Sequence, residues 1–528
     1  MAWSACAPAA AGRDRAASDN EGNIDRRTRC AFGTEAFEIS HDISAIPLVD
    51  DFVFQRPVRR SVLLSLGVAP GRDSKPRPDT TDVYTKCSDD VSLMTYMAIT
   101  IGVGTLDLSE AVAKCGYIPG IICLLSLAGI HLFLACRIIE VPYHLQKHDL
   151  GTFGDIAKAS LPECLPSKLW MLVFMLGLMQ WFGSCSIYLT VLLTAIDNIF
   201  CGGERCVLPY MKMIIGMFLI YPAFKTKASD LMLASKVSLC CMFMLGGIEL
   251  VCALIFGITA PVNDHDSFGD EIGPGIRDMM LAFSGVGIWP FIVSEMLRPQ
   301  QAKQVAARAI GCTTGFYTMI AMTCYFGYGV KIKNGEEDPI KVLNDNGGVF
   351  SKAAVLISFF LMVKTVATFP LYFWPLCREV ETYFRLEDML CMELGLPWAF
   401  RRVQGIKASI RVGLLFLTVC PTFCSDYEPF KEFMKAVVFL VQFFFPSWFA
   451  VFAIQKHLRI LGNKGTADGA SSALCFDKKR YFFGNISLHV VATGTLAVIT
   501  TVMGYFFIED LLMKLWELHR SSRVPLVT

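Results

Sequence analysis

The stretch IGVGTLDLSEA, from Ile101 to Ala111, decides the fold of this chain. It lies inside an apolar segment, where Gly102 and Gly104 loosen a helix and two carboxylates, Asp107 and Glu110, follow. A carboxylate at mid-membrane depth is costly and therefore marks a functional residue by default. The two acids share a face if the segment is helical, because residues three apart are neighbours. The stretch predicts a broken membrane helix beside a binding site.

The composition is that of a membrane protein with many spans. Of the 528 residues, 54% are hydrophobic, and the mean hydropathy is +0.48, which is too apolar for a soluble chain of this length. The net charge is only +1, so no nucleic-acid partner is indicated. The 20 cysteines form no pattern with metal-ligand spacing. Since catalytic triads and nucleotide loops are also missing, we expect no metal, no cofactor and no enzyme.

Eleven candidate transmembrane spans follow one another along the chain. They lie near residues 91–113, 117–139, 170–200, 207–224, 231–259, 277–297, 307–330, 350–376, 409–425, 432–455 and 485–508. Several approach the ~20 apolar residues that cross a hydrocarbon core. We predict an all-α polytopic membrane protein with a mostly disordered cytoplasmic tail over 1–90, a transmembrane domain over 91–510 and a short C-terminal tail over 511–528.

Loop charge predicts the orientation. Lysine and arginine gather in alternate loops, which places those loops and the N-terminus in the cytoplasm. The remaining loops, such as KNGEEDPIKVLNDNGG, are acidic. Cys201 and Cys206 bracket a short loop that this orientation places outside, where a disulfide is expected to persist. The plasma membrane is the expected location, with an acidic vacuole-like or lysosome-like membrane as the alternative.

A second interruption lies five spans after the first. The segment FSGVGIWP carries Gly285, Gly287 and Pro290. Paired interrupted helices at matching places in two halves are typical of inverted-repeat transporters, whose sites lie between the breaks. The alternative for each break alone is a kink that helps helices pack.

These segments resemble the amino acid/auxin permease family of the amino acid–polyamine–organocation superfamily. The resemblance covers about residues 91–510 and rests on the order of GVGTLDLSEAVAKCGYIPG, TFGDIA, FGSCSIYLTVLLTAIDNI, FSGVGIWPFIVSEMLRPQQ and TFPLYFWP. It implies a five-plus-five inverted repeat with one extra helix, broken in helices 1 and 6. It also implies transport of amino acids across a lipid bilayer with a proton or sodium gradient.

The resemblance also implies roles for single residues. Amide groups at the first break would bind the substrate carboxylate, as helix N-termini bind anions. Carbonyls at the second break would receive the amine, Tyr188 would close over the site, and Trp289 would border the side-chain pocket. The substrate-binding residues expected on these grounds, with the two acids added, are Gly102, Gly104, Thr105, Asp107, Glu110, Tyr188, Phe283, Ser284, Gly285, Gly287 and Trp289.

The eighth span departs from the family pattern. Sodium-coupled relatives use hydroxyls of this helix as sodium ligands, but here Lys364 accompanies Thr365 and Thr368. A fixed ammonium would replace the sodium ion and make transport sodium-independent. The alternative is a lysine that snorkels towards water.

The buried charges allow three readings. Asp107 and Glu110 could receive a cationic substrate side chain, carry a proton, or pair with Lys364, since buried charges are commonly paired. Glu295 is expected to pair with Arg298 in an inner gate or to lie at a helix end. For His131 and Glu249 we expect hydrogen bonds between helices, with a proton path as the alternative. Phe443 and its aromatic neighbours are expected to face lipid.

Together these observations predict a secondary transporter that moves amino acids by alternating access. Proton coupling is expected rather than sodium coupling, with a preference for lysine or arginine. The alternatives are a general neutral amino acid permease and a sensor that signals through the N-terminal tail.

Overall fold

The computed structural model describes residues 86–102, 104–147, 150–162, 168–201, 214, 218–219, 231–259, 266–332, 339–386, 397–423, 428–464 and 485–521. Within these residues the secondary structure is helical, apart from one isolated parallel bridge between Cys87 and Met296. Most of the expected tail over 1–90, nearly all of the span expected near 207–224, and Cys206 lie outside the described residues.

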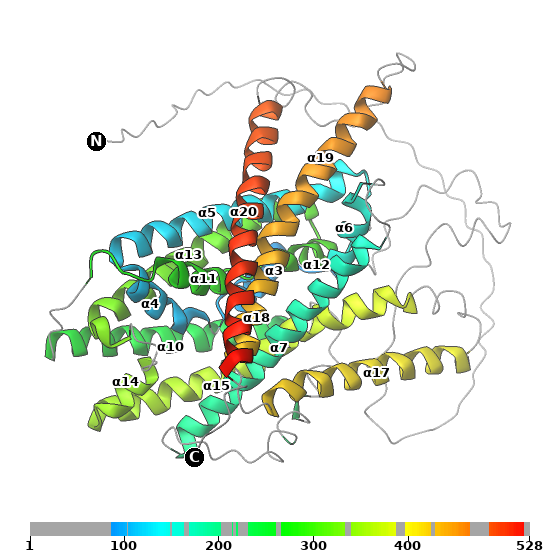
Figure 1. The fold of residues 1–528 in the computed structure, drawn as a ribbon. Helices are drawn as coiled ribbons and strands as arrows, with labels where there is room; N and C mark the ends of the chain where they lie inside the picture. Colours follow the sequence, from blue (N-terminus) through cyan, green and yellow to red (C-terminus); the bar gives the residue numbers. More distant parts are fainter. Residues whose placement is uncertain are drawn as a thin grey trace, which may run out of the picture. The chain divides into compact units, whose positions relative to one another are not determined.

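The helices follow the predicted order along the chain (Figure 1). The first part contains α3 (Asp89–Thr100), α4 (Gly104–Cys115), α5 (Tyr117–His144), α6 (Phe153–Ser160), α7 (Leu169–Cys201) and α10 (Met232–Thr259). The second part contains α11 (Ile272–Ala282), η2 (Val286–Ile288), α12 (Trp289–Glu295), η3 (Pro299–Gln301), α13 (Ala302–Tyr328), η4 (Gly329–Ile332), α14 (Pro339–Asp345) and α15 (Gly348–Tyr383). The last part contains α17 (Pro397–Val419), η5 (Cys420–Phe423), α18 (Glu428–Phe439), η6 (Leu440–Phe444), α19 (Phe445–Lys464) and α20 (Asn485–Ser521).

The helical, membrane-spanning character of the chain is confirmed. Within the described residues, 7 helices are long and apolar enough to cross a membrane. The count of eleven spans and the division into two five-helix halves stay predictions. Helix α20 continues to Ser521, past residue 510, where the transmembrane domain was expected to end.

Local sequence explains where the broken helices start and stop. Ser88 caps α3 by accepting from the Val91 amide at 3.4 Å, and Asp89 and Asp90 occupy its first turn. Proline stands in the first turn of α12, where its missing N–H and fixed φ are tolerated. We call the gap between α3 and α4 the first break, and the gap between α11 and α12 the second break.

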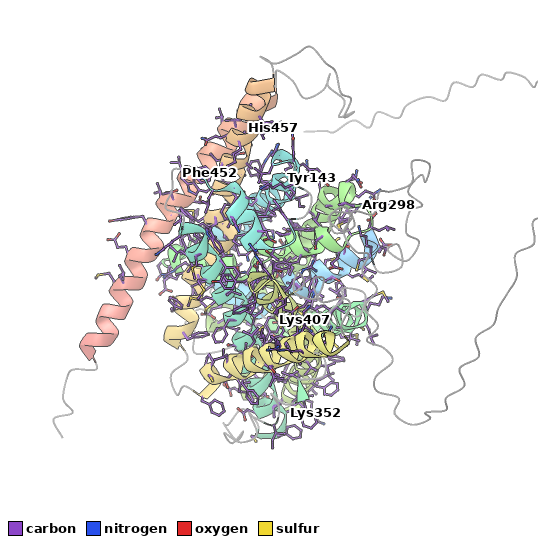
Figure 2. All side chains as sticks on the ribbon, turned by 90° about the vertical axis from the view of Figure 1, so that its right-hand side faces the viewer. Tyr143, Arg298, Lys352, Lys407, Phe452 and His457 are labelled. Carbon is purple, nitrogen blue, oxygen red and sulfur yellow. The ribbon has the colours of Figure 1, made fainter. Side chains whose placement is uncertain are left out.

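Long helices surround both breaks. Helix α13 contacts α3, α4, α5 and α10, while α15 contacts α7 and α10, and α4 lies against α11. Helix α17 carries Lys407, which Figure 2 labels. Charge ties this helix to α15, because Arg411 donates to Glu381 at 2.7 Å and the Lys407 ammonium lies 3.7 Å from the same carboxylate. The contacts of α13 with α3 and of α4 with α11 bring together segments that are more than a hundred residues apart.

Candidate functional site

The two breaks touch each other. A Cβ atom at Gly104 would lie 3.1 Å from the Cα atom of Ala282, so α4 and the end of α11 approach as closely as glycine permits. A Cβ atom at Gly285 would lie 2.8 Å from the Thr100 hydroxyl and 2.9 Å from the Tyr96 hydroxyl. An added Cβ atom would therefore crowd backbone at Gly104 and the ends of two side chains at Gly285. The juxtaposition expected from the paired glycine motifs is present.

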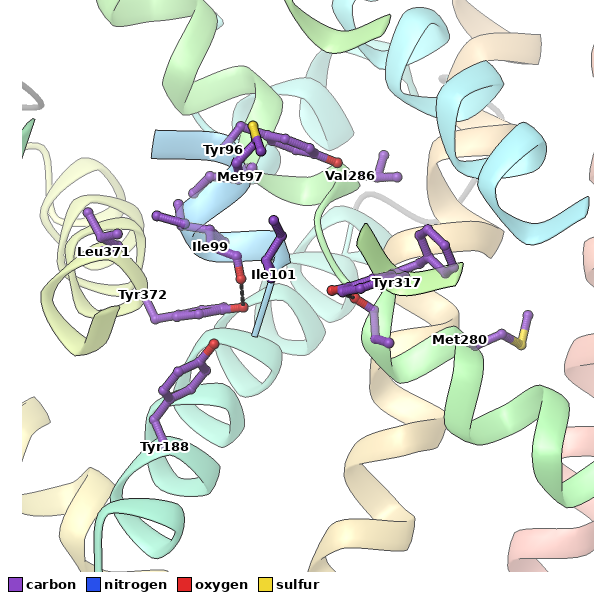
Figure 3. Packing of buried hydrophobic residues seen from close by; sticks show 14 of the residues in the cluster. Tyr96, Met97, Ile99, Ile101, Tyr188, Met280, Val286, Tyr317, Leu371 and Tyr372 are labelled. Atoms are coloured by element: carbon purple, nitrogen blue, oxygen red, sulfur yellow. Dashed lines mark hydrogen bonds between the residues drawn. The ribbon is translucent and has the colours of Figure 1, made fainter. Parts of the chain in front are cut away.

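Hydroxyl groups satisfy the backbone at the first break. Tyr372 of α15 donates to the Ile99 carbonyl at 2.7 Å (Figure 3), and Thr105 donates to the Gly102 carbonyl at 2.8 Å. The Tyr317 hydroxyl of α13 lies within hydrogen-bond reach of the Thr100 carbonyl and of the Ala282 carbonyl, 3.0 Å away. Because unwound backbone inside a membrane must find partners in protein, these hydroxyls make the breaks tolerable.

Tyr188 stands at the first break, where the family resemblance places it. Its hydroxyl would lie 2.7 Å from a Cβ atom at Gly102, and its ring centroid is 4.7 Å from that of Tyr372. Figure 3 shows Tyr188 and Tyr372 beside the end of α3. Tyr317 and Tyr372 were not singled out from the sequence, since a tyrosine in an apolar helix carries no signal that it will meet a break.

An aromatic and imidazole cluster lines the second break. Trp289 is fully buried and stacks on Tyr96 with ring centroids 4.4 Å apart. The Tyr96 hydroxyl is hydrogen-bonded to His131 Nε2, and the His131 ring lies 5.7 Å from the Phe283 ring. The expected bond between helices at His131 is thus confirmed. The same holds for Glu249, which accepts from the Cys324 thiol at 3.3 Å.

Glu110, on α4 after the first break, belongs to a chain of ion pairs. Glu110 lies 2.6 Å from Lys114, which lies 3.1 Å from Asp278 of α11. Asp278 also contacts Lys435 of α18 at 2.6 Å, and Lys435 contacts Glu432 at 2.6 Å. The chain holds α4, α11 and α18 together by alternating charge. Asp107 is partly buried on α4.

Lys364 has a different environment. It is fully buried on α15, and its ammonium lies 5.2 Å from the centre of the Tyr188 ring. Among the residues that the structure describes, no atom accepts a hydrogen bond from its Nζ. The reading that Asp107 and Glu110 pair with Lys364 is therefore wrong. Glu110 pairs instead with Lys114, which lies one helical turn away on the same face of α4.

The hydroxyls near Lys364 are engaged with their own neighbours. Thr365 donates to the Leu361 carbonyl at 2.7 Å, and Thr368 donates to the Lys364 carbonyl at 2.9 Å. Ser238 of α10 lies 2.7 Å from the Thr368 hydroxyl. This arrangement joins α10 to α15 at the place where sodium-coupled relatives are expected to hold an ion.

The far end of α15 carries a second acidic cluster. Glu295 pairs with Arg378 of α15, which corrects the expected pairing with Arg298. Glu379 accepts hydrogen bonds from the Phe153 and Gly154 amides at 2.8 and 3.3 Å, at the start of α6. The sequence did not reveal these partners, because they come from distant segments. Cys201 is disulfide-bonded, while its expected partner, Cys206, lies outside the described residues.

Comparison with known protein families shows the family of this chain. Residues 91–511 match the family described as "Transmembrane amino acid transporter protein". The chain belongs to this family, and it is therefore a membrane transport protein and not an enzyme. The resemblance drawn from the sequence is confirmed.

Two solved structures show distant likeness. A manganese transporter of Eremococcus coleocola is 10% identical with a TM-score of 0.40, covering 85% of this chain and 99% of that chain. MhsT in complex with L-phenylalanine is 12% identical with a TM-score of 0.45, covering 79% of this chain and 98% of that chain. No curated protein matches the chain.

Proposed function

We propose that this protein carries amino acids by alternating access, with the substrate backbone held where the two breaks meet. The observation that supports this most is the direct contact between the breaks, closed by the Tyr188 hydroxyl over Gly102. The start of α4 would present amide groups to the substrate carboxylate, as helix N-termini do for anions. Carbonyls from Phe283 to Gly287 would receive the amine. Trp289 would border the substrate side chain.

Sodium-independence is the second part of the proposal. Lys364 is fully buried on α15, the helix that supplies hydroxyl ligands for sodium in sodium-coupled relatives. A fixed ammonium there would repel a sodium ion and would supply the positive charge itself. A buried ammonium without a counter-charge is costly, so an arriving substrate carboxylate would stabilise it.

Proton coupling is the third part. Without sodium as the driving ion, uphill transport needs another gradient. His131, which is hydrogen-bonded to Tyr96 at the second break, is the titratable group that would carry the proton. We therefore expect an inward proton gradient to drive uptake.

Substrate charge is the fourth part. Glu110 is neutralised by Lys114, and the buried charge beside Tyr188 is positive. This arrangement favours substrates with an uncharged side chain over the lysine and arginine preference expected from the sequence. Both classes can be compared in one competition experiment.

Uptake by the purified full chain in liposomes tests these parts together. We expect uptake of labelled alanine or leucine that needs no sodium and rises when the outside is made acidic. Excess arginine should inhibit less than excess leucine. A strict need for sodium would refute the role of Lys364, and strong inhibition by arginine alone would restore the cationic preference.

Two variants of one helix isolate the lysine. Lys364→Met should reduce uptake at least tenfold, because it removes the charge proposed to replace the ion. Lys352→Met is the matched control, since Lys352 is exposed on the same helix (Figure 2) and should behave as wild type. Equal activity of both variants would contradict the proposal.

The tail and the location complete the proposal. We expect a plasma-membrane protein with a cytoplasmic N-terminus, in which deletion of residues 1–85 leaves transport intact. A sensor would instead lose signalling on that deletion. An epitope at the N-terminus should be reached by antibody only after the cells are permeabilised.

A further inference from the structure

Three polar atoms beside the second break have no partner in the part of the chain that the structure describes. These atoms are Oε1 and Nε2 of Gln180, on α7, and Nε2 of Gln442, in the η6 turn. Both side chains are fully buried. Buried polar atoms are nearly always hydrogen-bonded in native proteins, so three in one place call for an explanation.

The two glutamines converge on Gly287. The Gly287 amide donates to Gln442 Oε1 at 2.8 Å. A Cβ atom at Gly287 would lie 3.1 Å from Gln442 Nε2 and 3.8 Å from Gln180 Oε1. All three residues therefore border one small region next to the second break.

The hydrogen-bonding groups that this region offers are the same in either orientation of the two amides. Turning the Gln442 amide over would set its NH₂ group against the Gly287 N–H, donor against donor. Turning Gln180 over would exchange two atoms that both lack a partner. In either case two NH₂ groups and one carbonyl oxygen are offered to whatever lies between them.

The backbone at Gln442 is also unusual. Leu440 to Phe444 form a π-helical turn between α18 and α19. Such turns are rare in proteins, and those that do occur are often at functional sites, because the extra residue redirects side chains. Here the turn places Gln442 against the second break, and Phe443 is buried instead of facing lipid as expected.

We propose that Gln180 and Gln442 form a subsite for the end of the substrate side chain, which takes an uncharged group that both donates and accepts hydrogen bonds, such as a carboxamide. This inference rests on the proposed function, because Gly287 belongs to the break that holds the substrate backbone. Two NH₂ donors and one carbonyl acceptor complement a carboxamide. They do not complement a cation, which accepts nothing, or a carboxylate, which donates nothing.

An aromatic path links the subsite to the first break. Trp181 follows Gln180 in the chain and lies 3.7 Å from the Gly287 Cβ position. Its ring centroid is 6.2 Å from that of Tyr372, which is 4.7 Å from that of Tyr188. The substrate backbone and the carboxamide subsite would thus lie along one wall of aromatic rings.

Inhibitor selectivity tests the subsite. Uptake of labelled alanine or leucine by the full chain in liposomes is measured against glutamine, methionine, lysine and glutamate, which have side chains of similar length. Wild type should be inhibited best by glutamine. Gln180→Met should weaken inhibition by glutamine at least tenfold relative to methionine, and Gln442→Met should shift the ratio in the same direction.

A control and a stability measurement separate this from a structural role. Gln455→Met, on exposed surface of α19, should leave the glutamine-to-methionine ratio unchanged. Gln180→Met should melt at the same or a higher temperature than wild type, because it removes a buried amide without partners. A variant that folds normally but keeps the wild-type ratio would overturn the subsite.

The two proposals fail in different ways. Uptake of apolar amino acids with an unchanged ratio in both glutamine variants would overturn the subsite and keep the transporter. In that case the amides hold water and not substrate. Absence of uptake of every amino acid by wild type would overturn both proposals.

Discussion

The first and second breaks lie in contact and share the Tyr317 hydroxyl, but their other hydrogen-bond partners differ. At the first break, the freed carbonyls of Ile99, Thr100 and Gly102 each meet a hydroxyl. At the second break, the Gly287 amide meets the carboxamide oxygen of Gln442. A hydroxyl has a single proton, which it donates to the carbonyl. A carboxamide whose oxygen accepts one hydrogen bond still has two N–H groups to donate.

This difference indicates that the two breaks have different roles in substrate binding. The first break is fixed by bonds from three helices, which suits a site that every substrate backbone must fit. The second break retains hydrogen-bonding capacity, which suits discrimination between side chains. The following predictions test the comparison, from the largest expected effect to the smallest.

Enlarging the glycine between the breaks should have the largest effect. In Gly104→Val the new side chain would meet the Ala282 backbone, which cannot yield as a flexible side chain can. We expect at least a tenfold loss of uptake and a stability loss of about 1–3 kcal/mol, as for overpacked cores. Gly129→Val on α5 is the control, because a Cβ atom at that position would meet no atom of another helix within 4 Å. If the two variants lose thermal stability and uptake to the same extent, the close contact between α4 and α11 is contradicted.

Removing the hydroxyl shared by the breaks should have the next largest effect. Tyr317→Phe leaves the Thr100 and Ala282 carbonyls without this donor, at a cost of about 1–3 kcal/mol. We expect lower thermal stability together with slower uptake. Tyr325 lies on the same helix as Tyr317, and Tyr325→Phe removes its hydrogen bond to the Asp266 carbonyl. This variant should lower thermal stability without slowing uptake. If both variants transport equally well, the bridge does not matter for function.

A smaller effect is expected at the start of α4. Thr105→Val keeps the shape of the side chain and removes its bond to the Gly102 carbonyl, which still accepts from the Thr105 amide at 3.3 Å. The loss should be about 0.5–1.5 kcal/mol, measured by thermal unfolding. A loss as large as that of Tyr317→Phe would show that the first break depends on its local hydroxyl and not on the distant tyrosine.

The smallest effect is expected outside the breaks. Glu110 is 27% exposed at its side chain and pairs with Lys114, so Glu110→Gln should cost at most about 1 kcal/mol. The ratio of inhibition by arginine and leucine should not change. A large loss of arginine inhibition would show that this carboxylate binds the substrate after all.

Much of the architecture could be predicted from the sequence. Apolar length determines which segments can cross a membrane, and both breaks were located from the glycines within these segments, with Pro290 added at the second. Tyr188 and Trp289 were placed by family resemblance, and they lie beside the first and second breaks, respectively. The charges were less predictable: Glu110 pairs with Lys114 and not with Lys364, and Glu295 pairs with Arg378 and not with Arg298.

The sequence by itself determined the membrane class, the helical architecture and the positions of the breaks, because hydrophobic length and the missing Cβ of glycine act within a few residues. Only the tertiary structure decided which groups close the breaks and which charges are neutralised. Tyr317 and Thr100 are more than two hundred residues apart, and Gln442 is more than a hundred from Gly287. Hydrogen bonds and ion pairs act over a few ångströms, so such partners are selected by the approach of helices in space and not by their spacing along the chain.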